Sequence, residues 1–132
     1  MVEVVAGLYM QDGKALLGLR KPDGRRGGLW ECPGGKVDPG ESHLAALRRE
    51  WHEELGVAAS WINQQPIATA FFDLEICFTV TLYAVRAIRG TPQCLDHAEL
   101  RWVDLKHAIE YLPCSPAMYL HWPMVRWWLE RA

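Results

Sequence analysis

The sequence predicts a layered α+β domain, and three observations lead to this prediction. β-rich runs occupy residues 2–9 and 14–20, an amphipathic helix pattern follows at 42–56, and alternation of apolar and polar residues resumes over 75–85. Strands mixed with helices in this order indicate an α+β arrangement. The length of 132 residues is close to the commonest domain size, so we expect residues 1–132 to form a single domain.

The amino-terminal runs predict a β-hairpin. Val2–Tyr9 and Lys14–Arg20 are rich in strand-forming residues, and Gln11-Asp12-Gly13 between them is typical of a tight turn. A glycine-rich loop, Pro22–Gly28, follows the hairpin. The basic side chains of this region suit a polyphosphate, although a solvated loop has the same composition; they are Arg20, Lys21, Arg25, Arg26 and Lys36.

Residues 42–56 predict a helix with one acidic face. Ser42 is a suitable N-cap and Gly56 a suitable C-terminal stop. Glu50, Glu53 and Glu54 lie at i, i+3 and i+4, so they share about a 100° sector of the helix. A solvated acidic face is the ordinary interpretation, but the opposite face is apolar at Leu44, Leu47, Trp51 and Leu55. We therefore expect a helix packed on a core, with its carboxylates held in a fixed direction.

The second half of the chain predicts further strands and a terminal helix. Residues 67–73 are apolar, and 75–85 alternates so that Ile76, Phe78, Val80, Leu82 and Ala84 share one face. Residues 100–103 predict a short strand, and 105–111 predict a helical turn.

Ser115-Pro116 is typical of the start of a last helix, which Pro123 is expected to kink or interrupt. Three of the seven tryptophans crowd this helix at Trp122, Trp127 and Trp128. Buried packing of the helix explains them, and an interface in a homodimer remains open.

Composition excludes several functional classes. A net charge of −2 gives no general attraction to nucleic acid or to an anionic membrane. No apolar run approaches the roughly 18 residues of a membrane helix, and the first residues lack the pattern of a signal peptide. The cysteines at 32, 77, 94 and 114 form neither a Cys-x-x-Cys pair nor a compact framework. We expect buried free thiols, a cytoplasmic location, and a monomer or homodimer without nucleic-acid or membrane partners.

The spacing of charges and glycines around the acidic helix is that of the Nudix box. The box positions are Gly35, Glu41, Arg49, Glu50, Trp51, Glu53, Glu54, Gly56 and Val57. Every charge and glycine of the box is present, and Trp51 stands where an aliphatic residue is more usual. So many fixed positions over 23 residues are a specific pattern. The chain resembles a Nudix hydrolase, and this resemblance implies an α/β/α sandwich with a mixed β-sheet over about the whole chain.

The resemblance also implies roles for individual residues. Mg²⁺, or Mn²⁺, would be held by the backbone carbonyl of Gly34 and the carboxylates of Glu50, Glu53 and Glu54, with Glu99 as a further ligand or the general base. An exposed acid at a strand start is the alternative interpretation of Glu99. Arg49 would bond and orient Glu53, and Glu41 would brace the loop. The predicted catalytic residues are thus Arg49, Glu53, Glu54 and Glu99.

The segment 29–37 resembles the MutT-like branch of this family, which hydrolyses nucleoside triphosphates to the monophosphate and pyrophosphate. This resemblance implies substrate contacts at Arg20, Glu31, Cys32, Pro33, Gly34, Lys36 and Ser115. Cys32 replaces a typical aromatic residue, and no Asn or Asp occupies 114–118, where the branch reads the base. We therefore expect no strong preference for 8-oxo-dGTP, since strong discrimination needs paired polar groups.

Other branches of the family fit less well. Asp73 stands where ADP-ribose hydrolases carry proline, and no tyrosine lies near it as in diadenosine polyphosphate hydrolases. The longer NADH and coenzyme A patterns are also absent. Hydrolysis of another nucleoside diphosphate derivative, and a non-catalytic nucleotide sensor, remain as alternatives. Because sensors of this fold commonly lose box carboxylates and this chain keeps them, an enzyme is favoured.

Overall fold

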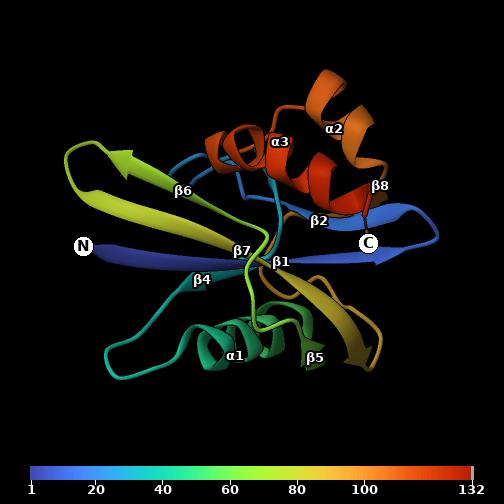
Figure 1. Cartoon of the computed structure of the whole chain (residues 1–132), viewed down its shortest axis with the longest axis horizontal. Helices are drawn as coiled ribbons and strands as arrows, with labels where there is room; N and C mark the ends of the chain where they lie inside the picture. Colours follow the sequence, from blue (N-terminus) through green and yellow to red (C-terminus); the bar gives the residue numbers. More distant parts are fainter. Residues whose placement is uncertain (132) are drawn as a thin grey trace.

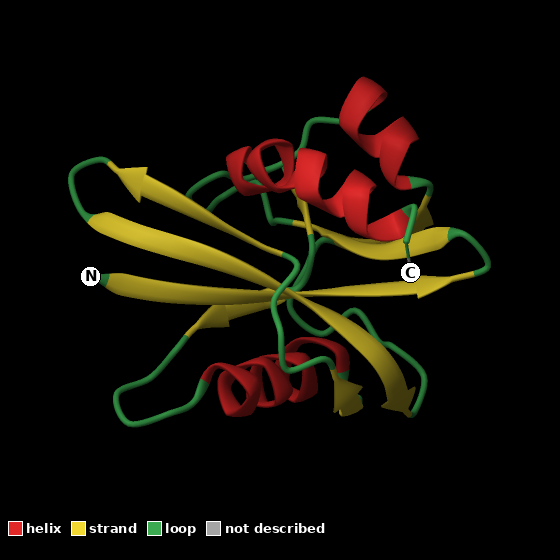
Figure 2. Cartoon of the chain, in the orientation of Figure 1, coloured by secondary structure: helices red, strands yellow, loops and turns green. Residues whose placement is uncertain are grey.

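The computed structural model describes residues 1–131 and places a mixed β-sheet between two helical layers (Figure 1). The strands are β1 (Val2–Gln11), β2 (Lys14–Leu19), β3 (Trp30–Glu31), β4 (Gly34–Lys36), β5 (Ala58–Ile62), β6 (Ala68–Asp73), β7 (Cys77–Arg89) and β8 (Glu99–Val103). The helices are α1 (His43–Leu55), α2 (Leu105–Tyr111) and α3 (Pro116–Leu129). Helix α1 lies on one side of the sheet and α2 and α3 on the other (Figure 2), so the predicted α/β/α sandwich is confirmed.

Strand β1 is the centre of the sheet, whose main path is β3-β2-β1-β7-β5. It runs parallel to β7, from Val2 beside Phe78 to Tyr9 beside Val85, while its far end turns back into β2. Strands β4, β6 and β8 pair antiparallel with β1, β7 and β2 respectively. The parallel β1–β7 pair among antiparallel neighbours is what makes the sheet mixed.

Two hydrophobic cores fill the spaces on either side of the sheet. Between the sheet and α1, Leu47, Trp51 and Leu55 pack against Val5 and Tyr83. The core on the α2–α3 side contains Ala6, Leu8, Leu17, Trp30, Phe78, Val80, Leu82, Ala84, Met118 and Val125. The predicted alternation along β7 is therefore confirmed from Phe78 to Ala84, because each face of the strand meets a different helical layer.

Helix α1 begins and ends where its local signals predict. The Ser42 hydroxyl accepts a hydrogen bond from the Ala45 amide at 3.1 Å. Gly56 adopts the left-handed conformation (φ +66°) and its amide bonds the His52 carbonyl. With both ends fixed and the apolar face buried, the acidic face is held relative to β4.

Several predictions about local structure are wrong. The predicted interruption at Pro123 is wrong, since α3 is continuous from Pro116 to Leu129 and the buried His121 and Val125 anchor the turns on either side; the predicted kink stays a prediction. Trp127 is 51% exposed, with its ring 4.2 Å from the Arg131 guanidinium, rather than buried by packing. Ile76 is also exposed, because it precedes the first residue of β7.

The cysteines and one strand also depart from prediction. All four thiols are free, as predicted, but Cys77 and Cys94 are exposed, whereas only Cys114 is fully buried. Strand β5 was not predicted, because it is short, irregular in register and exposed at Trp61.

Candidate active site

Arg49 connects the loop before α1 to the acidic face of the helix. Its Nε and one terminal nitrogen donate to both oxygens of Glu41, at 2.8 and 2.9 Å. The other terminal nitrogen donates to Glu50 at 2.9 Å and to Glu53 at 3.4 Å. The predicted contact with Glu53 is therefore present, but Glu41 and Glu50 are the closer partners. Arg49 also donates to the Lys36 carbonyl at 3.0 Å, which ties β4 to the helix.

Glu41 closes the loop that leads into α1. Besides its two bonds from Arg49, its carboxylate accepts the Asp38 amide at 3.0 Å. The hydrogen bond from Arg49 is the main reason that the pKa of Glu41 falls to about 2, with the Asp38 amide contributing. The ion pair with Glu41 in turn raises the pKa of Arg49. This geometry fits the predicted bracing role of Glu41.

The three carboxylates on α1 differ sharply in environment. The Glu53 side chain is 56% exposed, that of Glu50 is 17% exposed and that of Glu54 only 8%. Glu50 lies directly over Gly35 of β4, because a Cβ at that position would come within 2.6 Å of both carboxylate oxygens. Gly35 is therefore needed for the close approach of β4 and the acidic face.

Glu54 is a buried carboxylate with an unsatisfied oxygen. Its Oε2 has no hydrogen-bond partner among the described residues. Burial raises the pKa of Glu54 to about 9, and the negative charges of Glu50, Glu31 and Asp96 add to the effect. Burial also raises the pKa of Glu50. A divalent cation would offset the cost of ionising the buried carboxylates of Glu50 and Glu54. The oxygen donors of Glu50, Glu53 and Glu54 therefore fit the Mg²⁺ or Mn²⁺ that the sequence predicts.

The surroundings of Trp51 explain why an indole stands where the box usually carries an aliphatic residue. The indole is fully buried, and its Nε1 donates to the Pro33 carbonyl at 2.9 Å. The same carbonyl accepts the Gly7 amide at 2.9 Å. A Cβ at Gly7 would lie 2.8 Å from the indole, so the large ring fits only because β1 carries glycine there. Trp51 thereby holds the segment that delivers Gly34 to the site.

A cavity of about 310 Å³ opens between β4, β7 and α3. Its walls include most of the predicted substrate residues, namely Arg20, Glu31, Cys32, Gly34, Lys36 and Ser115. Pro33 is not among them, and its side chain is fully buried. Phe78, Val80 and Met118 form part of the apolar wall. The cavity thus joins a cationic end to an apolar interior.

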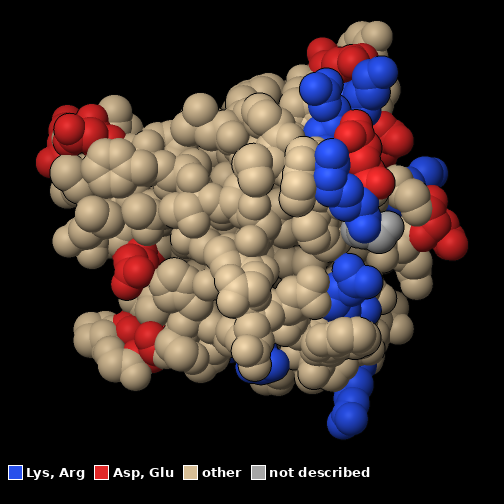
Figure 3. Space-filling model, in the orientation of Figure 1, with Lys and Arg blue, Asp and Glu red and all other residues tan. Residues whose placement is uncertain are grey.

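Of the basic cluster, Arg20, Arg26 and Lys36 reach the cavity wall. The Arg26 guanidinium lies 5.0 Å from the ring centre of Phe78 and 5.7 Å from that of Phe72. The face of the molecule shown in Figure 3 has charges of both signs gathered mainly along one edge and carries no broad basic surface.

Segment 114–118, at the place where the MutT-like branch reads the base, lies next to β3, which carries the predicted substrate residue Glu31. The Trp30 amide donates to the Pro113 carbonyl at 2.8 Å, and the Ser115 amide donates to the Trp30 carbonyl at 2.9 Å. The Ser115 side chain makes no cap bond to α3, although the residue is almost fully buried. Burial raises the pKa of the neighbouring Cys32 thiol to about 12, with Glu31 and Cys114 contributing. Cys32 is therefore a neutral thiol in the cavity wall.

Two acidic positions at the start of β8 must be distinguished. Glu99 begins the strand, opposite Leu19, and its carboxylate accepts two hydrogen bonds from Arg101 at 2.8 and 3.0 Å. It lies outside the group that Glu31, Glu54 and His97 form. Asp96, which sequence reasoning missed, adds negative charge to the surroundings of Glu54. His97, also missed, contacts Glu31 at 3.0 Å. The available signal was the pair Asp96-His97, a few residues before the strand predicted at 100–103.

Comparison with known proteins agrees with this geometry. The NUDIX domain model matches residues 1–128. The chain belongs to the Nudix family. The CTP pyrophosphohydrolase of Escherichia coli is 37% identical over 89% of this chain and 85% of its own length. A putative 8-oxo-dGTP diphosphatase 2 of Mycobacterium tuberculosis is 34% identical over 85% of this chain and 81% of its own.

Solved structures are similar to this chain over most or all of its length. The solution structure of the E. coli ORF135 protein has a TM-score of 0.85 and 34% identity, and it covers 100% of this chain and 91% of that protein. The chain is therefore a MutT-like Nudix pyrophosphohydrolase, as the box predicts for the family and segment 29–37 for the branch. No helix among residues 1–131 is both long and apolar enough to cross a membrane.

Proposed function

We propose that this Nudix enzyme hydrolyses nucleoside triphosphates to the monophosphate and pyrophosphate, with Mg²⁺ as the cation and Mn²⁺ as a substitute. The observation that carries the proposal is the junction of the cavity with the acidic face of α1. Arg20 and Lys36 line the cavity, and Gly35 of its wall lies against Glu50. A triphosphate between these cations is thus brought next to carboxylates that can hold its counterion.

The predicted catalytic and metal-binding residues, with Arg20 and Lys36, each have a role in this proposal. Arg20 and Lys36 neutralise phosphate charge, while Gly34, Glu50, Glu53 and Glu54 hold the cation. Bound Mg²⁺ would stabilise charge on the phosphates and acidify a water molecule. Arg49 fixes the carboxylates through the bonds described above. Glu99 is proposed to orient or deprotonate the attacking water.

The apolar interior of the cavity supports a broad base preference. Phe78, Val80 and Met118 supply contact area, whereas Ser115 offers one hydroxyl for reading a base. The relative that is 37% identical is named for CTP. We propose that pyrimidine triphosphates, CTP and dCTP among them, are accepted and that 8-oxo-dGTP is not strongly preferred, because discrimination of about 10⁴-fold needs paired polar groups.

Pyrophosphate release from CTP, dCTP, dGTP and 8-oxo-dGTP in the presence of Mg²⁺ tests both parts. We expect turnover of the pyrimidine triphosphates with kcat/KM values within about a hundredfold of that for 8-oxo-dGTP. A value for 8-oxo-dGTP a thousandfold above the rest would contradict the base preference. Binding of nucleotides with no turnover of any of them would favour the nucleotide sensor instead.

A further inference from the structure

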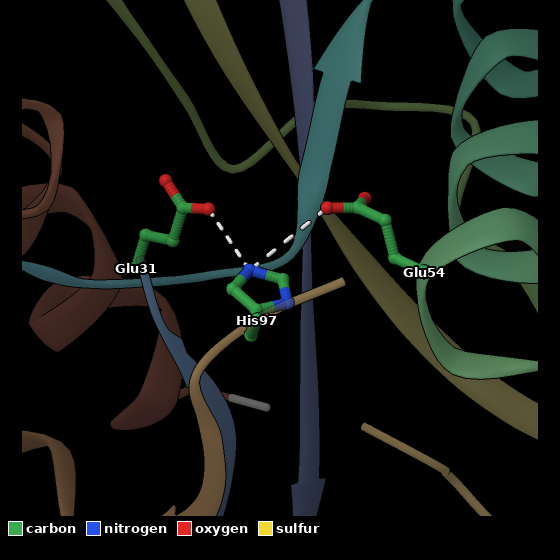
Figure 4. A group of neighbouring side chains, drawn as sticks. All are labelled: Glu31, Glu54 and His97. Atoms are coloured by element: carbon green, nitrogen blue, oxygen red, sulfur yellow. Dashed lines mark hydrogen bonds and ion pairs between the residues drawn. The ribbon is translucent and has the colours of Figure 1, made fainter. Parts of the chain in front are cut away.

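Three side chains from distant parts of the chain meet beside the acidic face of α1. Glu31 comes from β3, Glu54 from the last turn of α1 and His97 from the loop before β8 (Figure 4). The His97 Nε2 lies 3.0 Å from Glu31 Oε2 and 3.9 Å from Glu54 Oε1. One donor atom from each residue lies within 4.8 Å of the other two. The group is therefore compact enough for all three residues to hold one ion.

The imidazole is fixed in this position by the sheet beneath it. The His97 side chain is only 3% exposed. Its ring packs on β2 at Gly18, where a Cβ would come within 2.6 Å of His97 Nε2. The next residue, Ala98, donates its amide to the Leu19 carbonyl at 2.8 Å. Gly18 thus leaves the space that lets the ring face the two carboxylates.

Hydrogen bonds within the protein satisfy only part of this group. Glu31 accepts from Arg20 at 3.2 Å and lies 3.0 Å from His97 Nε2, so its carboxylate is paired, whereas Glu54 is not. The carboxylate of Glu54, which is 8% exposed, directs one oxygen at His97 and leaves Oε2 without a partner among residues 1–131. The Nδ1 of His97 is also buried without a partner, but Nε2 is the nitrogen that faces the carboxylates, so the unpaired oxygen of Glu54 is the atom that argues for an ion. Buried polar atoms are rarely left unpaired, because the lost hydration costs roughly 1–3 kcal/mol for each group. An ion between the three side chains would use donors that the fold already holds together.

We propose that Glu31, Glu54 and His97 form a binding site for a divalent transition-metal ion, Mn²⁺, Co²⁺ or Zn²⁺. An imidazole nitrogen beside two carboxylates suits these ions, whereas Mg²⁺ prefers oxygen ligands alone. Metal–ligand bonds of about 2.1 Å place donors roughly 3.0–3.4 Å apart, so the His97–Glu31 separation of 3.0 Å already fits and the Glu54 carboxylate, at 3.9 Å, would have to move closer. Three protein ligands leave coordination positions for water.

The proposed site differs from the cation site on the Nudix box. It uses Glu31 and His97, neither of which belongs to the box, and it shares only Glu54 with the box carboxylates. In two-metal centres the ions commonly lie about 3.5–4 Å apart, so a shared carboxylate such as Glu54 can bind both. Because the site consists of protein side chains alone, it is expected to fill in the absence of nucleotide. Its existence does not depend on the proposed substrate.

Pulsed EPR of the Mn²⁺-loaded protein without nucleotide tests the proposal directly. We expect ¹⁴N modulation from a coordinated imidazole in the wild type and its loss in His97→Gln. His52→Gln is the matched control, because His52 lies on α1 but points to solvent, and it is expected to keep the modulation. Glu31→Gln is expected to raise the Mn²⁺ dissociation constant at least tenfold while leaving the fold, followed by circular dichroism, unchanged.

Absence of ¹⁴N modulation in the wild type would overturn the proposal, as would modulation that survives in His97→Gln. If His97→Gln does not fold, Co²⁺ titration of the wild type and Glu31→Gln decides the question by visible absorption. A spectrum and an affinity that Glu31→Gln leaves unchanged would also overturn it. Because no nucleotide is used, these results are independent of the triphosphatase assay.

Discussion

Glu54 and Glu53 lie on the same helix face in opposite environments, one buried with an unpaired oxygen and one largely exposed. If both hold a catalytic cation, Glu54→Gln and Glu53→Gln will each lower kcat by about 10²-fold or more, the size typical of losing an electrostatic catalytic group. Steady-state pyrophosphate release measures the effect, and circular dichroism checks the fold. Glu110→Gln on α2 is the control and should retain wild-type rates. Mg²⁺-dependent activity retained by both α1 variants would refute their assignment.

Glu99 and Asp96 are the two candidates for the group that acts on the attacking water. We predict that Glu99→Gln lowers kcat far more than it weakens nucleotide binding, because Arg101 holds the Glu99 carboxylate in one orientation. Asp96→Asn is the paired comparison, since the charge of Asp96 influences Glu54. Measuring kcat and the nucleotide dissociation constant separates the two roles. A loss of kcat confined to Asp96→Asn would move the role from Glu99 to Asp96.

At the scale of elements, α1 packs on β1 where the large Trp51 side chain lies against Gly7. Gly7→Ala would place a methyl group 2.8 Å from both Trp51 and Val85, and overpacking of this kind typically costs about 1–3 kcal/mol. We predict a smaller cost for Gly7→Ala in a Trp51→Leu background, because the aliphatic side chain vacates that space. Urea unfolding of the four proteins in a double-mutant cycle measures the coupling. Additive free energies of unfolding would show that Gly7 does not accommodate the indole.

Local elements could be predicted from the sequence because their signals are local. Ser42 and Gly56 act within one turn of their own helix, so the ends of α1 agree with prediction. The contact between Glu31 and His97 joins residues 66 positions apart and depends on β2 pairing with both β3 and β8. No local pattern encodes that pairing, which is why the box carboxylates were predicted and His97 was not. Pro123 shows the converse, since tertiary packing of α3 outweighs a local helix breaker.

The stability of the whole molecule depends on pH through the paired Glu41 and the buried Glu54, whose effects have opposite signs. Glu41 has its pKa lowered from 4.5 to about 2, so its stabilising effect is present above pH 4.5 and is lost as the pH falls toward 2. Glu54 has its pKa raised from 4.5 to about 9, so the folded chain holds a proton that the unfolded chain has released. Its contribution is present below pH 4.5 and is lost as the pH rises toward 9.

The metal-free protein is therefore expected to be most stable in mildly acidic solution. Glu54→Gln should remove much of the decline between pH 4.5 and 9 and leave the acid limb in place, whereas Glu41→Gln should weaken the acid limb alone. Chemical unfolding in the presence of a chelator, from pH 2.5 to 9, measures both slopes, and each variant serves as the control for the other. Equal alkaline slopes in the wild type and Glu54→Gln would show that Glu54 is already ionised at neutral pH. Adding Mg²⁺ should stabilise the wild type more at pH 8 than at pH 5, because the cation binds the ionised carboxylates in the folded chain.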